Sequence, residues 1–274
     1  MSILLAIFYG IIQGITEFLP VSSSGHLAIL QRFFGMGDME TDYFTFAILL
    51  HLATLTAVFI IYWKDILPLV PAFFTMFGKF FGKNDKARLS DSERMVLYVI
   101  IATLPLIAAY FLKDYVEVLS GIPKAIGAIL IFNGVVLFVS DRFATGKKSI
   151  NHAKPSNALI VGLCQMLAVV PGLSRSGSTI TGGLTQGFTR EFAVKFSFIL
   201  SIPAILGANI TSIPKMFSDP VPSDEIAAYI FGMFAALLAG IAAMKLLMYI
   251  SRKANFRIFS YYCFIVGLLT LIFA

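Results

Sequence analysis

The chain has 274 residues, of which 58% are hydrophobic and 13% charged, and its formal net charge is +6. A soluble domain carries about 25% charged residues, so the composition excludes an ordinary water-soluble globular protein. The basic residues lie in short segments between apolar stretches, as in the loops of a membrane protein, and do not indicate a nucleic-acid-binding surface. Cys164 and Cys263 lie in apolar segments, so neither a disulfide framework nor a metal cluster is expected.

The first predicted element is a broken pair of helices over residues 1–20 and 22–35. Gln13 and Glu17 are four residues apart and share one face of the first helix. Pro20 ends that helix, because its ring clashes with the preceding turn and it donates no hydrogen bond. The serine run that follows can cap the second helix. In a membrane, such a break is tolerated only where protein or water satisfies it, so we treat it as a candidate site.

Further along the chain, several apolar stretches approach or exceed the roughly 20 residues that cross a bilayer core. We predict spans over 44–63, 95–112 and 123–140, a second broken segment over 157–190, and spans over 193–213, 225–250 and 257–274. Residues 36–43, 64–94, 113–122 and 141–156 are expected to be loops. No cleavable signal is predicted at the start, because no basic residues precede the first apolar run.

The two broken segments match at a constant offset of 152 residues. Pairs of identical residues in this register are Gly10 and Gly162, Gln13 and Gln165, Ser22 and Ser174, Ser24 and Ser176, Gly25 and Gly177, Phe44 and Phe196, and Phe46 and Phe198. This register predicts a duplicated chain. We therefore expect one all-α integral membrane domain, 1–274, made of repeats 1–150 and 151–274. Each repeat would hold one re-entrant broken pair and three full spans, giving six spans in total.

An odd number of crossings in each repeat gives the two repeats opposite orientations. Placing 64–94, 141–156, 187–195 and 251–257 in the cytoplasm puts 15 of the 21 Lys and Arg residues there, as the positive-inside rule requires. Both termini then face outward, and the first re-entrant pair enters from the outside. Inverted repeats with broken helices that meet at the midplane are also a transporter architecture, so transport is one hypothesis for the function.

The second break holds one arginine, Arg175, among hydroxyls and glycines in the run Pro171-Gly-Leu-Ser-Arg-Ser-Gly-Ser-Thr179. A cation inside a membrane marks a functional site unless it is merely paired. Guanidinium matches phosphate oxygens, and glycine-rich turns with serine caps add backbone N–H donors for an anion. The competing interpretation is that Arg175 pairs with Glu17 only to neutralise the two charges.

These motifs resemble the undecaprenyl-diphosphate phosphatase family, the bacitracin-resistance type. The resemblance rests on Gln13-x-x-x-Glu17, the run Glu17-Phe-Leu-Pro-Val-Ser-Ser-Ser-Gly-His26 and Pro171-Gly-Leu-Ser-Arg-Ser-Gly177, and it covers essentially the whole chain. The family's first motif admits Glu or Gln at its first position, and here it is Gln13. The resemblance implies hydrolysis of the terminal phosphate of undecaprenyl diphosphate. The product is the lipid carrier for peptidoglycan and other envelope polymers, which links the activity to cell shape and bacitracin resistance.

The same resemblance implies an outward-facing site in the plasma membrane and a divalent cation, Mg²⁺ or Ca²⁺. It assigns catalytic roles to Glu17, Ser23, His26 and Arg175. Substrate-binding groups are expected at Gln13, Ser22, Ser24, Ser174, Ser176 and Thr179, and metal ligands at Glu17 and Gln13. Carboxylate and carbonyl oxygens suit Mg²⁺, which would complete its shell with substrate oxygens and water. Besides the polyprenyl diphosphate, the expected partners are membrane lipids, and a homo-oligomer is compatible with the sequence.

Several alternatives stay open at this stage. Ser23 can attack with His26 or Glu17 as base, His26 can attack itself, or Glu17 can activate water while Ser23 binds phosphate. The serines can also be simple helix caps, and for His51 we expect a structural hydrogen bond. A transporter or flippase of a polyprenyl phosphate or another anion is the main alternative function, and a structural scaffold is the third.

Overall fold

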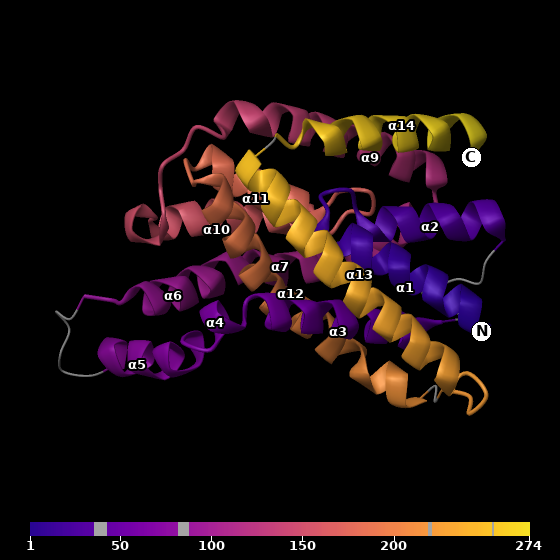
Figure 1. The fold of residues 1–274 in the computed structure, drawn as a ribbon, viewed down its shortest axis with the longest axis horizontal. Coiled ribbons are helices and arrows are strands. Elements are labelled where there is room, and N and C mark those ends of the chain that lie inside the picture. The colour runs from indigo at the N-terminus through magenta and orange to yellow at the C-terminus, as the bar shows by residue number, and fades with distance from the viewer. Residues whose placement is uncertain (36–42, 82–87, 219–220, 254) are drawn as a thin grey trace.

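The computed structural model describes residues 1–35, 43–81, 88–218, 221–253 and 255–274. Within these ranges the chain is almost entirely helical (Figure 1), and the only strand-like pairing is an isolated bridge between Lys148 and Phe188. The expected loop 36–43 lies, apart from residue 43, outside the described residues, as do Lys83 and Lys86 of the expected loop 64–94.

The helices that form the body follow one another in chain order. They are α1 (Ile3–Phe18), α2 (Ser23–Phe34), α3 (Phe44–Ile61), α6 (Asp91–Thr103) with α7 (Pro105–Ala109), α9 (Pro123–Ser140), α10 (Pro155–Leu167), α11 (Arg175–Thr185), α12 (Arg190–Ser218), α13 (Ile226–Lys253) and α14 (Arg257–Phe273). Shorter elements connect them: α4 (Trp63–Ile66), α5 (Leu69–Phe81), α8 (Lys113–Ser120) and the 3₁₀ turns η1 (Tyr110–Leu112), η2 (Asp141–Phe143) and η3 (Ile150–His152).

Within the described residues, five stretches of helix are long and apolar enough to cross a membrane. They are Phe44–Ile61, Asp91–Ala109, Pro123–Phe143, Arg190–Ile210 and Ile226–Arg252, and three shorter apolar helices accompany them, Ile3–Phe18, Pro155–Leu167 and Arg257–Phe273. The chain is therefore a multi-pass α-helical membrane protein. The sixth predicted span, 257–274, corresponds to one of the shorter helices, α14.

Both predicted breaks are present. Leu19, the residue before Pro20, is extended (φ −67°, ψ 144°), which ends α1, and the Ser22 hydroxyl accepts a hydrogen bond from the Gly25 N–H at the start of α2. In the second break, Ser174 caps α11 in the same way through the Gly177 N–H.

The expected loop 64–94 differs from the prediction, because it contains α4, α5 and the first residues of α6. Ala72 and Met76 of α5 are buried against Val96 of α6, and a capping box between Ser90 and Glu93 starts α6. This basic segment is helical because its apolar stripe packs against α6.

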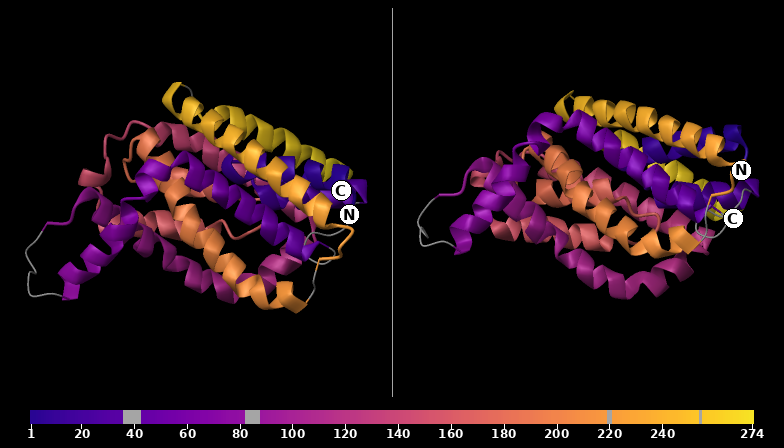
Figure 2. Two further views of the ribbon diagram at one scale, coloured as in Figure 1. Left: turned by 60° about the horizontal axis from the view of Figure 1, so that its bottom comes forward. Right: turned by 90° about the horizontal axis from the view of Figure 1, so that it is seen from below.

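The long helices cross closely at two matching glycines. A Cβ on Gly10 of α1 would lie 2.2 Å from the carbonyl oxygen of Gly232 in α13, and one on Gly162 of α10 would lie 2.5 Å from that of Ala102 in α6. Helices without a side chain at the crossing point can approach this closely. Both terminal ends of the chain lie at the end of the molecule opposite α5 (Figures 1 and 2), and α9 and α14 pack side by side.

Candidate active site

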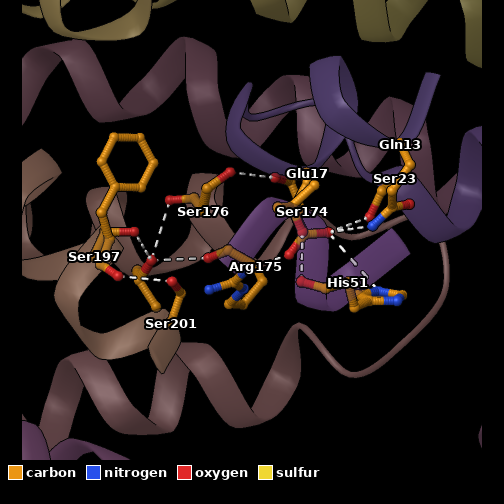
Figure 3. A network of polar contacts seen from close by, with 12 residues as sticks. Gln13, Glu17, Ser23, His51, Ser174, Arg175, Ser176, Ser197 and Ser201 are labelled. Carbon is orange, nitrogen blue, oxygen red and sulfur yellow. Dashed lines mark hydrogen bonds and ion pairs between the residues drawn. The ribbon is translucent and has the colours of Figure 1, made fainter. Parts of the chain in front are cut away.

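The buried carboxylate of Glu17, in the last turn of α1, is the centre of a polar network (Figure 3). Its Oε2 accepts a hydrogen bond from Gln13 Nε2 at 3.1 Å and another from the Ser23 hydroxyl at 2.9 Å. Gln13 reaches it because the two residues are one turn apart on one helix face. Ser23 reaches it because α2 starts immediately after the break.

Arg175, the first residue of α11, forms an ion pair with the other oxygen, Oε1 of Glu17. The Glu17 side chain is 7% exposed and that of Arg175 is 19% exposed, so both charges are largely removed from solvent. A buried charge is costly unless it is paired, and this pair neutralises both. The two breaks thus meet at one carboxylate, through two residues that are 158 positions apart in sequence.

Asn133 of α9 holds the two breaks together, and no sequence motif marks this residue. Its Nδ2 donates to the Pro20 carbonyl at 2.9 Å, and its Oδ1 accepts from the Ser174 N–H at 3.2 Å. The Ser176 hydroxyl adds a bond to the Leu19 carbonyl at 3.3 Å. These contacts satisfy backbone groups that the broken helices leave free.

The remaining predicted serines form two similar capping groups. Ser22 and Ser24 lie with their hydroxyl oxygens 3.4 Å apart in the first break, and Ser174 and Ser176 lie 3.0 Å apart in the second. Ser22 has a positive φ of 73°, which a residue with a side chain rarely adopts. At this point the two turns are in close contact, because a Cβ on Gly25 would lie 3.0 Å from the Cα of Gly172.

The hydroxyl of Thr179, which is predicted to bind substrate, makes its hydrogen bonds to groups other than Glu17. It donates to the Arg175 carbonyl at 2.9 Å and lies 2.6 Å from the hydroxyl of Ser197 in α12. It therefore links the first turn of α11 to α12, so its bonds position the helix that carries Arg175.

His26 is buried in α2, but both of its ring nitrogens are engaged away from Ser23. Nδ1 lies 2.7 Å from the Ser22 carbonyl oxygen, and Nε2 lies 2.8 Å from the hydroxyl of Tyr262 in α14, whose ring stacks on the imidazole. No sequence motif marked Tyr262. The structure brings Gln13, Glu17, Ser23 and Arg175 into one network, and it places His26 beside α14.

His51 of α3 is a further residue near the carboxylate. Its Nδ1 lies 2.9 Å from the Ala47 carbonyl oxygen, which confirms the predicted structural hydrogen bond. Its Nε2 lies 4.0 Å from Oε2 of Glu17, close enough for an ion pair when the imidazole is protonated. No sequence pattern predicts this second contact, because His51 stands alone in an apolar run.

For a divalent cation, the oxygen donors near Glu17 are few but suitable. The Oε1 atom of Gln13 is buried and has no hydrogen-bond partner, so it is available as a carbonyl ligand beside the carboxylate. No group of three or more His, Cys, Asp or Glu side chains that could hold a metal occurs in the described part of the chain. The donor set therefore fits a hard cation that takes most of its ligands from substrate and water.

Comparison with known proteins gives one family over nearly the full length. The family model described as "Bacitracin resistance protein BacA" matches residues 6–269. An undecaprenyl-diphosphatase from Halothermothrix orenii is 37% identical over 275 residues, covering 100% of this chain and 99% of the relative. One from Alkaliphilus metalliredigens is 39% identical, with 98% of each chain covered, and one from Methanosphaera stadtmanae is 37% identical, with 99% and 98% covered.

Proposed function

The chain belongs to the bacitracin resistance protein BacA family, and we propose that it is an undecaprenyl-diphosphate phosphatase. It removes the terminal phosphate of undecaprenyl diphosphate and releases undecaprenyl phosphate, the lipid carrier for peptidoglycan and other envelope polymers. The observation that carries this proposal is the junction of the two breaks, where the carboxylate of Glu17 is paired with Arg175 and accepts a hydrogen bond from Ser23. The full-length similarity to named undecaprenyl-diphosphatases supports it.

Arg175 is the proposed phosphate-binding cation. A diphosphate offers guanidinium the same bidentate geometry as a carboxylate, so it competes with Glu17 for the Arg175 side chain. Charge that develops on the transferred phosphoryl group is then stabilised by a cation already held in a site of low exposure.

Ser23 is the proposed nucleophile, with Glu17 as its base. The Ser23 hydroxyl already donates to Glu17 Oε2 at 2.9 Å, so its proton has an acceptor in place. The Ser23 oxygen forms a bond to the terminal phosphorus, and the bond from that phosphorus to the bridging oxygen breaks. Undecaprenyl phosphate leaves, and water then cleaves the phosphoserine to give inorganic phosphate.

His26 has a positioning role in this proposal. Its contacts with the Ser22 carbonyl and Tyr262 fix the first turn of α2, which carries Ser23. A direct role as base for Ser23 is less well supported, because both ring nitrogens already have other partners within 2.8 Å.

Glu17 and Gln13 are the residues proposed to hold a divalent cation, Mg²⁺ or Ca²⁺. The unpartnered Oε1 of Gln13 and the adjacent carboxylate support this assignment. When bound, such an ion supplies positive charge that neutralises the phosphate oxygens.

The proposed architecture is one domain of two inverted repeats, 1–150 and 151–274, with six spans and two re-entrant pairs. The matching glycine crossings, the matching serine caps and the position of both termini at one end support it. With 17 residues, α14 reaches the lower limit for a spanning helix. The concentration of Lys and Arg in the loops at the opposite end supports a plasma-membrane orientation with the termini and the site outward.

The deciding experiment is phosphate release from undecaprenyl diphosphate by the purified protein in detergent, with Mg²⁺ or with EDTA. We expect metal-dependent release that Ser23→Ala and Arg175→Ala both abolish. Release by Ser23→Ala at the wild-type rate would move the attack to water or His26.

The inverted repeats also favour a transporter of polyprenyl phosphate. This alternative predicts movement of lipid across sealed vesicles and no phosphate release by the wild type.

A further inference from the structure

Two arginines line a cavity at the end of the molecule that is opposite the termini. Arg88 and Arg94 face a space of about 440 Å³ between the start of α6 and the segment that leads into α10. Its other walls are Leu89, Leu97, Tyr98, Asn151, Ala153 and Pro155. Two positive charges thus share a space with an apolar wall, well away from Glu17 in the sequence and the fold.

The charges of these arginines are not neutralised within the described part of the chain. Arg94 Nη1 donates to the Asn151 carbonyl at 3.2 Å, which orients the guanidinium without cancelling its charge. The carboxylate of the adjacent residue, Glu93, accepts hydrogen bonds from Lys79 Nζ and from the Ser90 N–H, each at 2.7 Å. Among the described residues, no ion pair joins a carboxylate to Arg88 or Arg94, and both side chains line the same cavity.

In the proposed topology, the cavity lies where helices enter the membrane. The span Asp91–Ala109 begins beside it, and α10 begins at Pro155 in its wall. Leu89 and Leu97 belong both to the cavity wall and to the cluster that packs α5 against α6. On α5, Phe74 and Phe80 remain 69% and 56% exposed. The apolar wall formed by Leu89 and Leu97 beside the two arginines suits a lipid, with its chains against the helices and its headgroup at the arginines.

We propose that this cavity is a binding site for the phosphate headgroup of an anionic phospholipid, with Arg88 and Arg94 as the recognising residues. Guanidinium is matched to phosphate, and basic pockets at the inner surface of a membrane bind anionic headgroups. The apolar walls favour a phospholipid over a soluble phosphate. This inference does not depend on the phosphatase reaction, because none of the residues involved belongs to the network at Glu17.

The test is a lipid titration of the full-length protein purified in a neutral detergent. Phosphatidylglycerol and phosphatidylcholine are added separately, and bound lipid is counted by native mass spectrometry. Removal of one basic residue near a membrane surface weakens anionic lipid binding about fivefold, so Arg88→Gln/Arg94→Gln is expected to weaken phosphatidylglycerol binding about 25-fold. Phosphatidylcholine binding is expected to stay unchanged.

Arg142→Gln is the matched control, because Arg142 is an exposed arginine of a predicted cytoplasmic loop that does not line the cavity. It is expected to bind phosphatidylglycerol within about twofold of wild type. If the double variant unfolds, Arg88→Gln alone serves as the test, with a fivefold loss expected. Equal binding by wild type and the cavity variants would overturn the proposal. So would full displacement of the lipid by an equal concentration of glycerol phosphate, which would indicate a site for a soluble anion.

Discussion

Replacing Arg175 by alanine is expected to destabilise the protein as well as to stop turnover, and adding Glu17→Gln is expected to restore only the stability. The carboxylate of Glu17 is 7% exposed, and Arg175 is its closest charged partner. Removal of one member of a buried ion pair costs about 3–5 kcal/mol. We expect the lower value, about 3 kcal/mol, because Gln13 and Ser23 still donate to the carboxylate and Arg175 keeps 19% exposure.

The double variant has no buried charge left without a partner, so its free energy of unfolding is expected to return to within about 1 kcal/mol of wild type. Turnover, in contrast, is expected to stay at least about 10³-fold below wild type in every variant that lacks Arg175. Unfolding by denaturant and phosphate release are measured on the same detergent samples, with Arg142→Ala as the control for loss of an exposed arginine. Recovery of turnover in the double variant would refute the reasoning, because the pair would then serve only to neutralise itself.

Three further predictions concern single residues. Ser23→Ala is expected to lose at least about 10³-fold in turnover, and to lose about 1–2 kcal/mol of stability because Glu17 loses one hydrogen-bond donor. A rate within tenfold of wild type would exclude a serine nucleophile. Asn133→Leu leaves the Ser174 N–H and the Pro20 carbonyl without their buried partner, so a loss of about 2–3 kcal/mol is expected in denaturant unfolding, and an unchanged midpoint would contradict the bridging role. Gly10→Ala places a Cβ 2.2 Å from a carbonyl oxygen and is expected to destabilise by about 1–3 kcal/mol, whereas Gly78→Ala, which meets nothing within 4 Å, serves as its control and should show no loss.

Much of the fold could be predicted because its signals are local. The apolar run 123–140 coincides with α9, and Pro20 ends α1 where the sequence predicted the first break. The sequence does not predict α5, because the charges around it are typical of a loop. Its apolar stripe becomes meaningful only when α6 is folded beside it.

The charged residues of the site could be predicted from the sequence, but the isolated polar residues that support it could not. The family resemblance assigns Glu17 and Arg175 to one site, and the cost of an unpaired charge inside a membrane makes a purely structural pair the competing interpretation. Asn133, Tyr262 and His51 each stand alone in an apolar span, so no spacing distinguishes them from ordinary buried residues. Their roles follow from partners that are far away in sequence, such as the Pro20 carbonyl for Asn133.

The proposed duplication also explains why one carboxylate receives both a serine and an arginine. Ser23 and Arg175 occupy the same position in their repeats, as the first residue after a serine cap, and they contact opposite oxygens of Glu17. The residue that matches Glu17 in the second repeat is Val169, and Gln165, which matches Gln13, bonds instead to the Ala102 carbonyl. Matched backbones therefore bring two equivalent positions to a single carboxylate, and different side chains at those positions give the proposed nucleophile in one repeat and the proposed phosphate-binding cation in the other. The double variant Ser23→Arg/Arg175→Ser exchanges the two side chains. It keeps the ion pair with Glu17, but each side chain now contacts the opposite carboxylate oxygen. We therefore expect stability to be retained and turnover to be lost.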